Sequence, residues 1–123
     1  MESLLGNSRR PDVTFYADGR IDITSRVAKI LRLKDGDVVD IGVYQNEYYL
    51  YVRNKACNLI GKHEAQCFAS KKNSCNYRVY SRKLCSAILG ISKTDKARIP
   101  AGEATELPDI GVAVPLIIRL NLM

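Results

Sequence analysis

A strongly basic segment is the first feature of this chain that could do chemistry. Residues 53–83 contain eight basic side chains and a single acidic one, Glu64. Such a cluster attracts polyanions, because each phosphate that it neutralises releases a condensed counterion. Lysines and arginines on an ordinary solvated surface would give the same count, so both interpretations stay open. The basic residues are Arg53, Lys55, Lys62, Lys71, Lys72, Arg78, Arg82 and Lys83.

Tyrosines lie within and beside this basic segment. They could form a platform on which unpaired bases stack, with Arg53 and Arg78 between them. The alternative is structural, because tyrosines on a hairpin commonly pack their rings on the core and leave the hydroxyl at its rim. The tyrosines concerned are Tyr44, Tyr48, Tyr49, Tyr51, Tyr77 and Tyr80.

Four cysteines and one histidine are the residues that could hold a metal ion. Cys57, Cys67, Cys75 and Cys85 are separated by nine, seven and nine residues, without the C-x-x-C pair of zinc or redox motifs. Three of the cysteines together with His63 could still form a zinc site. We expect instead reduced thiols in a reducing compartment, with no metal and no cofactor.

The sequence contains no recognisable catalytic motif. His63 has no evident nucleophile as a partner, and no glycine-rich loop that would hold a phosphate is present. Asp35 and Asp37 lie in Lys34-Asp35-Gly36-Asp37, where they are explained by turn formation. We therefore expect a protein that is not an enzyme.

The elements that must position these side chains are mostly strands. Two runs of alternating apolar residues flank Asp18-Gly19, which predicts a hairpin over residues 13–23. Further strands are expected at 38–43, 48–52, 65–69, 76–80, 96–99 and 112–120, with a long loop over 100–111. The predicted inner face of the first hairpin consists of Val13, Phe15, Ile21 and Ile23.

Two short helices are predicted between these strands. Thr24 or Ser25 is expected to cap the first helix, which runs to about Leu31. Ser81 is expected to cap the second, which Gly90 should end, since glycine often follows a last helical turn.

Length and composition indicate one globular domain. The chain has 123 residues, of which 46% are hydrophobic and 26% charged, with a net charge of +6. No window approaches the ~20 apolar residues of a membrane span, and the start lacks the pattern of a secretory signal. We expect a cytoplasmic protein without membrane contact, with a flexible lead over residues 1–11 and a single domain over 12–123.

The two halves of this domain, about 12–55 and 64–120, are similar to each other. Residues 30–41 align without gaps on residues 88–99, and Ser25-Arg26 corresponds to Ser81-Arg82. Each half is predicted to contain a strand, a short helix, a turn and a strand.

A family resemblance rests on Gly19-Arg20-Ile21-Asp22-Ile23, a short helix, and Leu31 to Ile41 around Asp35-Gly36-Asp37. This pattern resembles the swapped-hairpin unit of the AbrB/MazE/SpoVT family, although that family often has proline where Thr24 stands and glycine where Arg32 stands. The resemblance implies a mainly β fold with two short helices. Two β-α-β units would form a small pseudo-symmetric β-barrel of the cradle-loop or double-psi type, with an extra tyrosine-rich hairpin.

The resemblance also implies a function, because that family binds DNA through basic residues. The chain would then be a DNA-binding transcriptional regulator or an antitoxin-like protein that contacts duplex DNA. The matching positions are Arg20 and Lys29, with Arg26 as a neighbour. If the two copies are equivalent, the other half of a pseudo-twofold basic face would consist of Arg78, Arg82 and Lys83. Simple helix-surface charge is the competing interpretation of these residues.

Two other functions stay open. The chain could be a phage or mobile-element structural protein that uses the barrel for self-association or for binding a protein partner. It could also be an enzyme subunit or adaptor built on a double-psi barrel.

Overall fold

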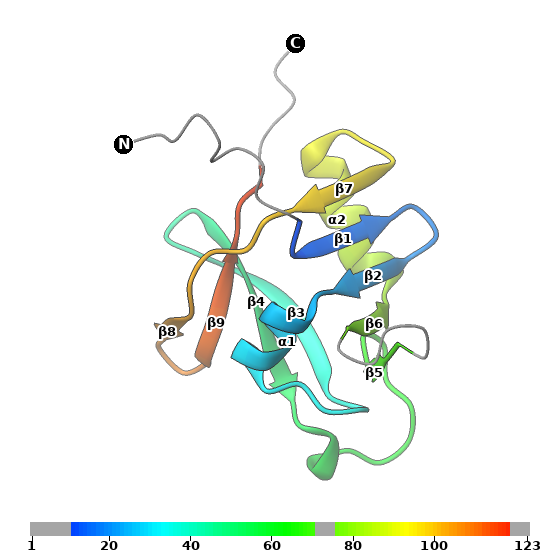
Figure 1. Ribbon diagram of the computed structural model, residues 1–123, viewed down its shortest axis with the longest axis vertical. Helices are drawn as coiled ribbons and strands as arrows, with labels where there is room; N and C mark the ends of the chain where they lie inside the picture. Colours follow the sequence, from blue (N-terminus) through cyan, green and yellow to red (C-terminus); the bar gives the residue numbers. More distant parts are fainter. Residues whose placement is uncertain (1–10, 71–75, 119–123) are drawn as a thin grey trace.

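The computed structural model describes residues 11–70 and 76–118 as a mainly β protein with two α-helices and two antiparallel sheets (Figure 1). The predicted lead falls almost wholly outside the described residues, as do Lys71, Lys72 and Cys75. Neither described helix has the length and apolar character needed to cross a membrane.

The first sheet has five strands in the order β5-β6-β2-β1-β7, and each neighbouring pair is antiparallel. Strands β1 and β2 form the predicted hairpin, in which Gly19 takes the positive φ of +99°. The strands are β1 (Val13–Tyr16), β2 (Arg20–Ile23), β5 (Cys67–Ala69), β6 (Tyr77–Tyr80) and β7 (Lys96–Ile99).

The second sheet has four strands in the order β3-β4-β9-β8, also antiparallel. The tyrosine-rich hairpin is β3 and β4, and its turn residues Gln45 and Asn46 both have positive φ. Strand β8 corrects the prediction of a loop over 100–111, because its three residues are too short a run to show alternation. The strands are β3 (Val38–Tyr44), β4 (Glu47–Asn54), β8 (Thr105–Leu107) and β9 (Gly111–Leu116).

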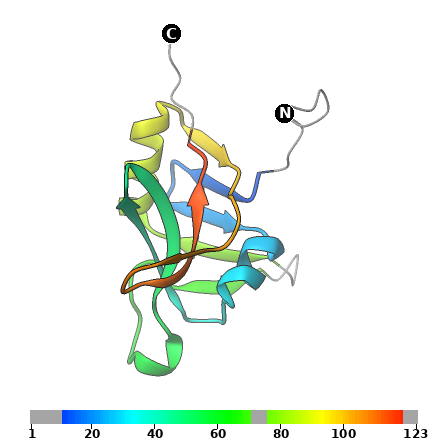
Figure 2. The same ribbon diagram turned by 90° about the vertical axis from the view of Figure 1, so that its left-hand side faces the viewer.

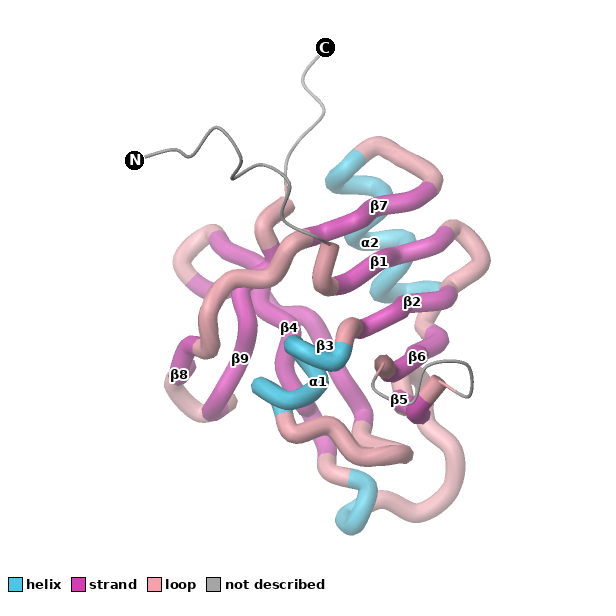
Figure 3. The backbone as a smooth tube through the Cα atoms, viewed as in Figure 1, coloured by secondary structure: helices cyan, strands magenta, loops and turns pink. Residues whose placement is uncertain are grey.

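The two helices lie on different parts of this framework. Helix α2 (Arg82–Ser92) packs behind β1, β2 and β7 in the view of Figures 1 and 3. Helix α1 (Ser25–Leu31) follows β2 and packs against β9 of the second sheet, away from α2 (Figure 2). One face of the five-stranded sheet therefore carries α2, and the opposite face does not.

Both helices end at a non-glycine residue with left-handed backbone. Arg32 ends α1 with φ 53°, and Lys93 ends α2 with φ 55°. Gly90, which was predicted to end α2, lies inside the helix, because Lys93 takes the left-handed conformation and its N–H bonds the carbonyl of Leu89. The gap-free alignment of 30–41 with 88–99 is therefore wrong, since α1 has 7 residues and α2 has 11.

One hydrophobic core joins both halves of the chain. All four residues of the predicted inner face of the first hairpin are at most 1% exposed. Around them lie Val27 and Leu31 of α1, Cys85 and Ile88 of α2, and residues from both β3 and β9. Ile30 of α1 and both Leu84 and Leu89 of α2 are only partly buried and pack against this core.

The sheets form two open layers within the described residues, and no closed barrel is found. They are joined where Val38 of β3 makes an isolated bridge to Gln66, just before β5. Each half has the element order strand, strand, helix, strand: β1-β2-α1-β3 and then β5-β6-α2-β7.

Candidate nucleic-acid interface

The face of the five-stranded sheet opposite α2 carries alternating basic and aromatic side chains. Successive residues of a strand point to opposite faces, and the buried members of these strands face the core and α2. We call the other set the basic sheet face. It consists of Thr14 and Tyr16 on β1, Arg20 and Asp22 on β2, Phe68 on β5, Arg78 and Tyr80 on β6, and Lys96 and Arg98 on β7.

Asp22 organises the centre of this face. Its Oδ1 accepts a hydrogen bond from Nε of Arg78 over 3.1 Å, and its Oδ2 lies 3.6 Å from Nε of Arg20. The strand register supports this arrangement, since Asp22 lies opposite Arg78 on one side and Thr14 on the other. Both arginines therefore approach the carboxylate through Nε, and their side chains remain 31% and 39% exposed.

Tyr16 positions two cations next to this centre. The guanidinium carbon of Arg20 lies 3.9 Å from the ring centroid, and Nζ of Lys96 lies 5.2 Å from it. The contact with Tyr16, and then the charge of Asp22, raise the pKa of Arg20 above its ordinary value. Arg20 is therefore a permanent cation held in a defined orientation.

Two aromatic rings on this face are open to solvent. Tyr80 is 59% exposed and Phe68 is 53% exposed. Phe68 lies opposite Arg78, and Tyr80 lies opposite Arg20, so each of these aromatic residues has an arginine as its cross-strand neighbour. Neither ring belongs to a core cluster, which leaves both available for contact with a ligand.

The structure divides the predicted DNA-contacting residues among several places. Arg20 and Arg78 lie together on the basic sheet face. Arg82 and Lys83 are exposed at the start of α2, which packs on the opposite side of the sheet, and Lys29 is exposed on α1. The predicted two-fold basic face built from all six residues is therefore not assembled.

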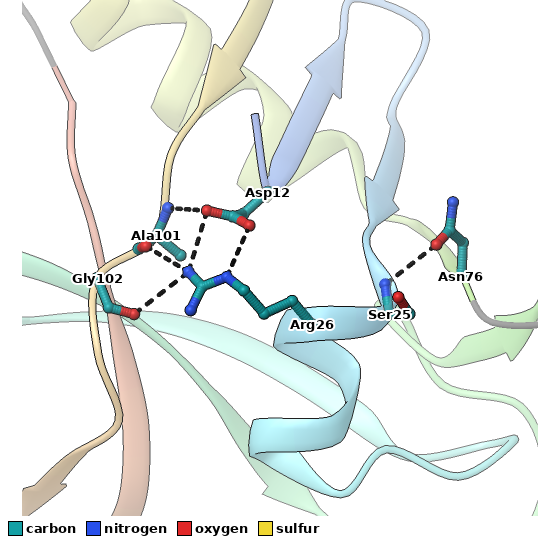
Figure 4. Close-up of polar contacts among 6 residues, drawn as sticks. All are labelled: Asp12, Ser25, Arg26, Asn76, Ala101 and Gly102. Atoms are coloured by element: carbon teal, nitrogen blue, oxygen red, sulfur yellow. Dashed lines mark hydrogen bonds and ion pairs between the residues drawn. The ribbon is translucent and has the colours of Figure 1, made fainter. Parts of the chain in front are cut away.

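Arg26 is held in a structural contact rather than on this face (Figure 4). Its Nε and one terminal nitrogen bind both oxygens of Asp12, over 3.0 and 3.1 Å. The same terminal nitrogen donates to the carbonyl of Ala101, and the Asp12 carboxylate also accepts from the Ala101 N–H over 2.7 Å. The terminal nitrogen also lies 3.5 Å from the carbonyl oxygen of Gly102. We call this set of contacts the clamp, and it joins α1 to the start of β1 and to the segment before β8.

The caps of the helices differ from each other. Ser81 caps α2 as predicted, because its Oγ accepts from the N–H of Leu84 over 3.1 Å. Thr24 occupies the cap position of α1 without a side-chain hydrogen bond to the helix. Asn76, from the other half of the chain, accepts from the N–H of Ser25 over 3.0 Å instead (Figure 4).

Two tyrosines of the β3–β4 hairpin, Tyr49 and Tyr51, serve the fold rather than a stacking platform. Tyr49 is 8% exposed and its hydroxyl donates to Glu47 over 2.9 Å, which raises its pKa. The hydroxyl of Tyr51 donates to Asp40 over 3.3 Å, and its pKa is raised by burial and then by Asp40. These two rings pack in a small apolar cluster with Leu107 and Ala113 and leave their hydroxyls at its rim, as the structural interpretation predicted.

The described cysteines are free thiols in separate environments. Sγ of Cys67 donates to the carbonyl of Lys34, and Sγ of Cys85 donates to the carbonyl of Arg20. Burial raises the pKa of Cys85 and raises the pKa of Cys67 to about 12, whereas Cys57 is exposed. The described residues contain no group of three or more side chains that could hold a metal ion.

The turn residues predicted from the sequence connect the two halves. Asp37 is 1% exposed and its carboxylate accepts from the N–H groups of Lys34 and Ala56. Asp35 accepts from the N–H of Ala69 over 2.7 Å. Both acids therefore serve the fold.

A second basic surface lines an open groove of about 730 Å³ between the end of α1, β4 and β9. Two of its three cations are paired, because Arg53 lies 3.6 Å from Asp40 and Lys55 lies 3.4 Å from the buried Asp37. The third is Arg32, and the acidic Glu106 also lines the groove. This groove therefore offers less uncompensated charge to a ligand than the basic sheet face does.

Four cationic or aromatic residues of the basic sheet face were missed in the sequence. Lys96 and Arg98 alternate with the buried Ala97 and Ile99, so period-two alternation could have identified their shared face. Tyr16 and Phe68 could not be assigned to this face from the sequence, because the order of the strands decides their neighbours. Comparisons with family models, curated proteins and solved structures find no match to this chain.

Proposed function

We propose that this chain is a non-enzymatic nucleic-acid-binding protein that uses the basic sheet face, in the role of a transcriptional regulator or an antitoxin-like protein. The observation that carries the proposal is the charge on this face. It presents four cations, Arg20, Arg78, Lys96 and Arg98, and one carboxylate, Asp22. A net charge of three positive units on one sheet face complements a phosphate backbone.

Features of strand pairing support the finer part of the proposal, that the halves are two copies of one swapped-hairpin-like unit. Strands β2 and β6 pair antiparallel with Asp22 opposite Arg78, and these residues correspond when Ser25 is aligned with Ser81. The bridge between Val38 of β3 and Gln66, just before β5, corresponds to the pairing of β7 with β1. In both cases the strand that follows a helix in one half contacts the first strand region of the other half. Arg32 has left-handed backbone at the position where the family often has glycine.

The test measures nucleic-acid binding as a function of salt. We expect labelled oligonucleotides to bind at about 50 mM salt and to dissociate towards about 200 mM, because released counterions drive the association. Replacing Lys96 and Arg98 together by alanine should lower the slope of log affinity against log salt by about 1.5. The control replaces Arg82 and Lys83 by alanine, which removes the same charge from α2.

The outcomes separate the possibilities. Equal effects of the two double variants would mean that binding depends on the overall charge of the protein rather than on the basic sheet face. Absence of binding to both duplex and single-stranded oligonucleotides at low salt would rule out the proposed function.

Assembly with a protein partner or with further copies of the chain is the second candidate. It is favoured by the tip of the β3–β4 hairpin, where Val43 is 64% exposed and Tyr44 is 40% exposed. Measurement of the mass in solution, with and without nucleic acid, distinguishes it. A defined oligomer that dissociates on replacement of Val43 by aspartate would support this candidate.

A further inference from the structure

The basic sheet face has an ordered pattern that a general attraction to polyanions does not need. In one row across the strands, Tyr80 lies opposite Arg20, Arg20 stacks on Tyr16, and Tyr16 lies opposite Lys96. In the next row, Phe68 lies opposite Arg78, and Thr14 lies opposite Arg98 on the far side of Asp22. Aromatic rings and cations therefore alternate across the sheet.

The two solvent-exposed rings lie at one side of this pattern. Phe68 of β5 lies opposite Arg78 of β6, and Tyr80 lies two residues from Arg78 on the same strand β6. The two rings are therefore diagonal neighbours. Diagonal neighbours in a sheet are about 7–8 Å apart, within reach of aromatic side chains. Two flat apolar surfaces thus lie side by side, and Arg78 is the cross-strand neighbour of Phe68 and lies two residues from Tyr80.

The chemistry of these rings selects among nucleic acids. In a duplex the flat faces of the bases are covered by their neighbours, and only edges and phosphates are accessible. Unpaired bases present their faces, and these stack on aromatic side chains with little dependence on sequence. Phosphates alone would explain the cations, but they give no role to two exposed rings.

The other side of the face fits a phosphate backbone. Lys96 and Arg98 are exposed on β7, the opposite edge strand from β5. Five strands span about 19 Å at the usual strand spacing of ~4.8 Å. A strand of a few nucleotides crossing the sheet could therefore stack bases near β5 and β6 and reach cations near β7.

We propose that the basic sheet face binds single-stranded nucleic acid, with unpaired bases stacked on Tyr80 and Phe68. This inference rests on the proposed function, and it narrows the ligand from nucleic acid in general to unpaired strands. Duplex DNA, which the family resemblance implied, becomes an alternative outcome of the test.

The experiment compares a labelled poly-dT strand of about 16 nucleotides, a length that covers a typical single-strand site, with a duplex of the same length. We expect the single strand to bind at least about tenfold more tightly. Tyr80→Leu and Phe68→Leu should each weaken single-strand binding by about tenfold or more, which is the usual cost of losing one base-stacking contact. The salt slope should not change, since neither variant removes a charge. Tyr44→Leu, an exposed tyrosine on the other sheet, is the matched control.

A fluorescence measurement gives an independent readout that does not depend on loss of a side chain. The chain contains no tryptophan, so Tyr80→Trp introduces a single indole on the face. Stacking of a base on this indole should quench its emission when poly-dT is added, and duplex should quench it much less. Circular dichroism of each variant checks that the fold is retained.

The outcomes separate this inference from the proposed function. Equal or tighter duplex binding that Tyr80→Leu and Phe68→Leu leave unchanged, with no quenching in Tyr80→Trp, would overturn the inference and leave nucleic-acid binding in place. If neither oligonucleotide binds at low salt, both proposals fail together.

Discussion

The outer faces of the two sheets contain the same kinds of residue in opposite situations. On the four-stranded sheet, Tyr49 and Tyr51 give their hydroxyls to carboxylates, and Tyr49 packs with Leu107 of β8 and Ala113 of β9. On the five-stranded sheet, Tyr80 and Phe68 are more than half exposed, and no described segment covers them. A tyrosine's environment, rather than its presence on a strand, decides whether it serves the fold or is available to a ligand.

The segment before β8 is fixed beside the second sheet. Ala101 bridges to Leu116, and the N–H of Gly102 donates to the carbonyl of Pro115 over 2.8 Å. The clamp of Arg26 on Asp12 and Ala101 fixes this segment to the start of β1. The chain thus holds a segment beside the second sheet and leaves the far face of the first one open.

The largest expected effect comes from breaking the clamp. Arg26→Met should lower the free energy of unfolding by about 3 kcal/mol, because the two charge-assisted hydrogen bonds from Arg26 to the buried carboxylate of Asp12 would be lost. Lys29→Met on the same helix should change it by less than about 0.5 kcal/mol. Denaturant unfolding of both variants measures the difference. Weaker nucleic-acid binding by Arg26→Met at unchanged stability would instead make Arg26 a ligand contact.

A smaller effect is expected where the segment meets the second sheet. A Cβ at Gly102 would lie 2.7 Å from Cγ of Pro115, whose ring cannot rotate away. Gly102→Ala should therefore destabilise the protein by about 1–3 kcal/mol, as overpacking commonly does. Gly90→Ala is the control, because its Cβ would meet no atom within 4 Å and its site lies inside α2. That change should stabilise the protein by about 0.5–1 kcal/mol. Thermal unfolding would show a contradiction if both variants shifted in the same direction.

The smallest effect distinguishes the tyrosines of the two faces. Tyr51→Phe should cost about 1 kcal/mol through loss of the hydrogen bond to Asp40, whereas Tyr80→Phe should cost less than about 0.5 kcal/mol. The raised pKa of Tyr51 means that the folded state favours its neutral phenol. The contribution of Tyr51 is therefore complete below the ordinary tyrosine pKa of about 10 and is lost as the pH rises through the higher folded value. The unfolding curves of wild type and Tyr51→Phe should therefore differ at neutral pH and converge at alkaline pH.

Local chemistry made much of the fold predictable. Asp18-Gly19 between alternating runs indicated the first hairpin, because few residues besides glycine accept the φ of +99° found at Gly19. Ser81 predicted the start of α2, since its side chain bonds a helix N–H three residues away. The turn role of Asp37 also followed from its own turn, because its carboxylate accepts from the N–H of Lys34. Each of these inferences depended on residues close together in the chain.

Features that depended on distant segments were not predictable in this way. Asn76 caps the helix that begins at Ser25, 51 residues earlier in the chain, and nothing near Ser25 indicates it. Gly90 lies inside α2, because Lys93, three residues later, takes the left-handed conformation that ends the helix. Arg26, which had the type and position of a DNA contact, is held instead by Asp12 and Ala101.

The sequence alone determined most of the strands, the two helices and most of the turns, because propensity, capping and alternation act over a few residues. It also determined that basic and aromatic residues are plentiful. Only the tertiary structure decided which of them share a surface, since the order β5-β6-β2-β1-β7 brings Phe68, Arg20 and Arg98 from distant parts of the chain onto one sheet face. Pairing between distant strands depends on how the whole apolar core is buried, and no short stretch of residues contains that information.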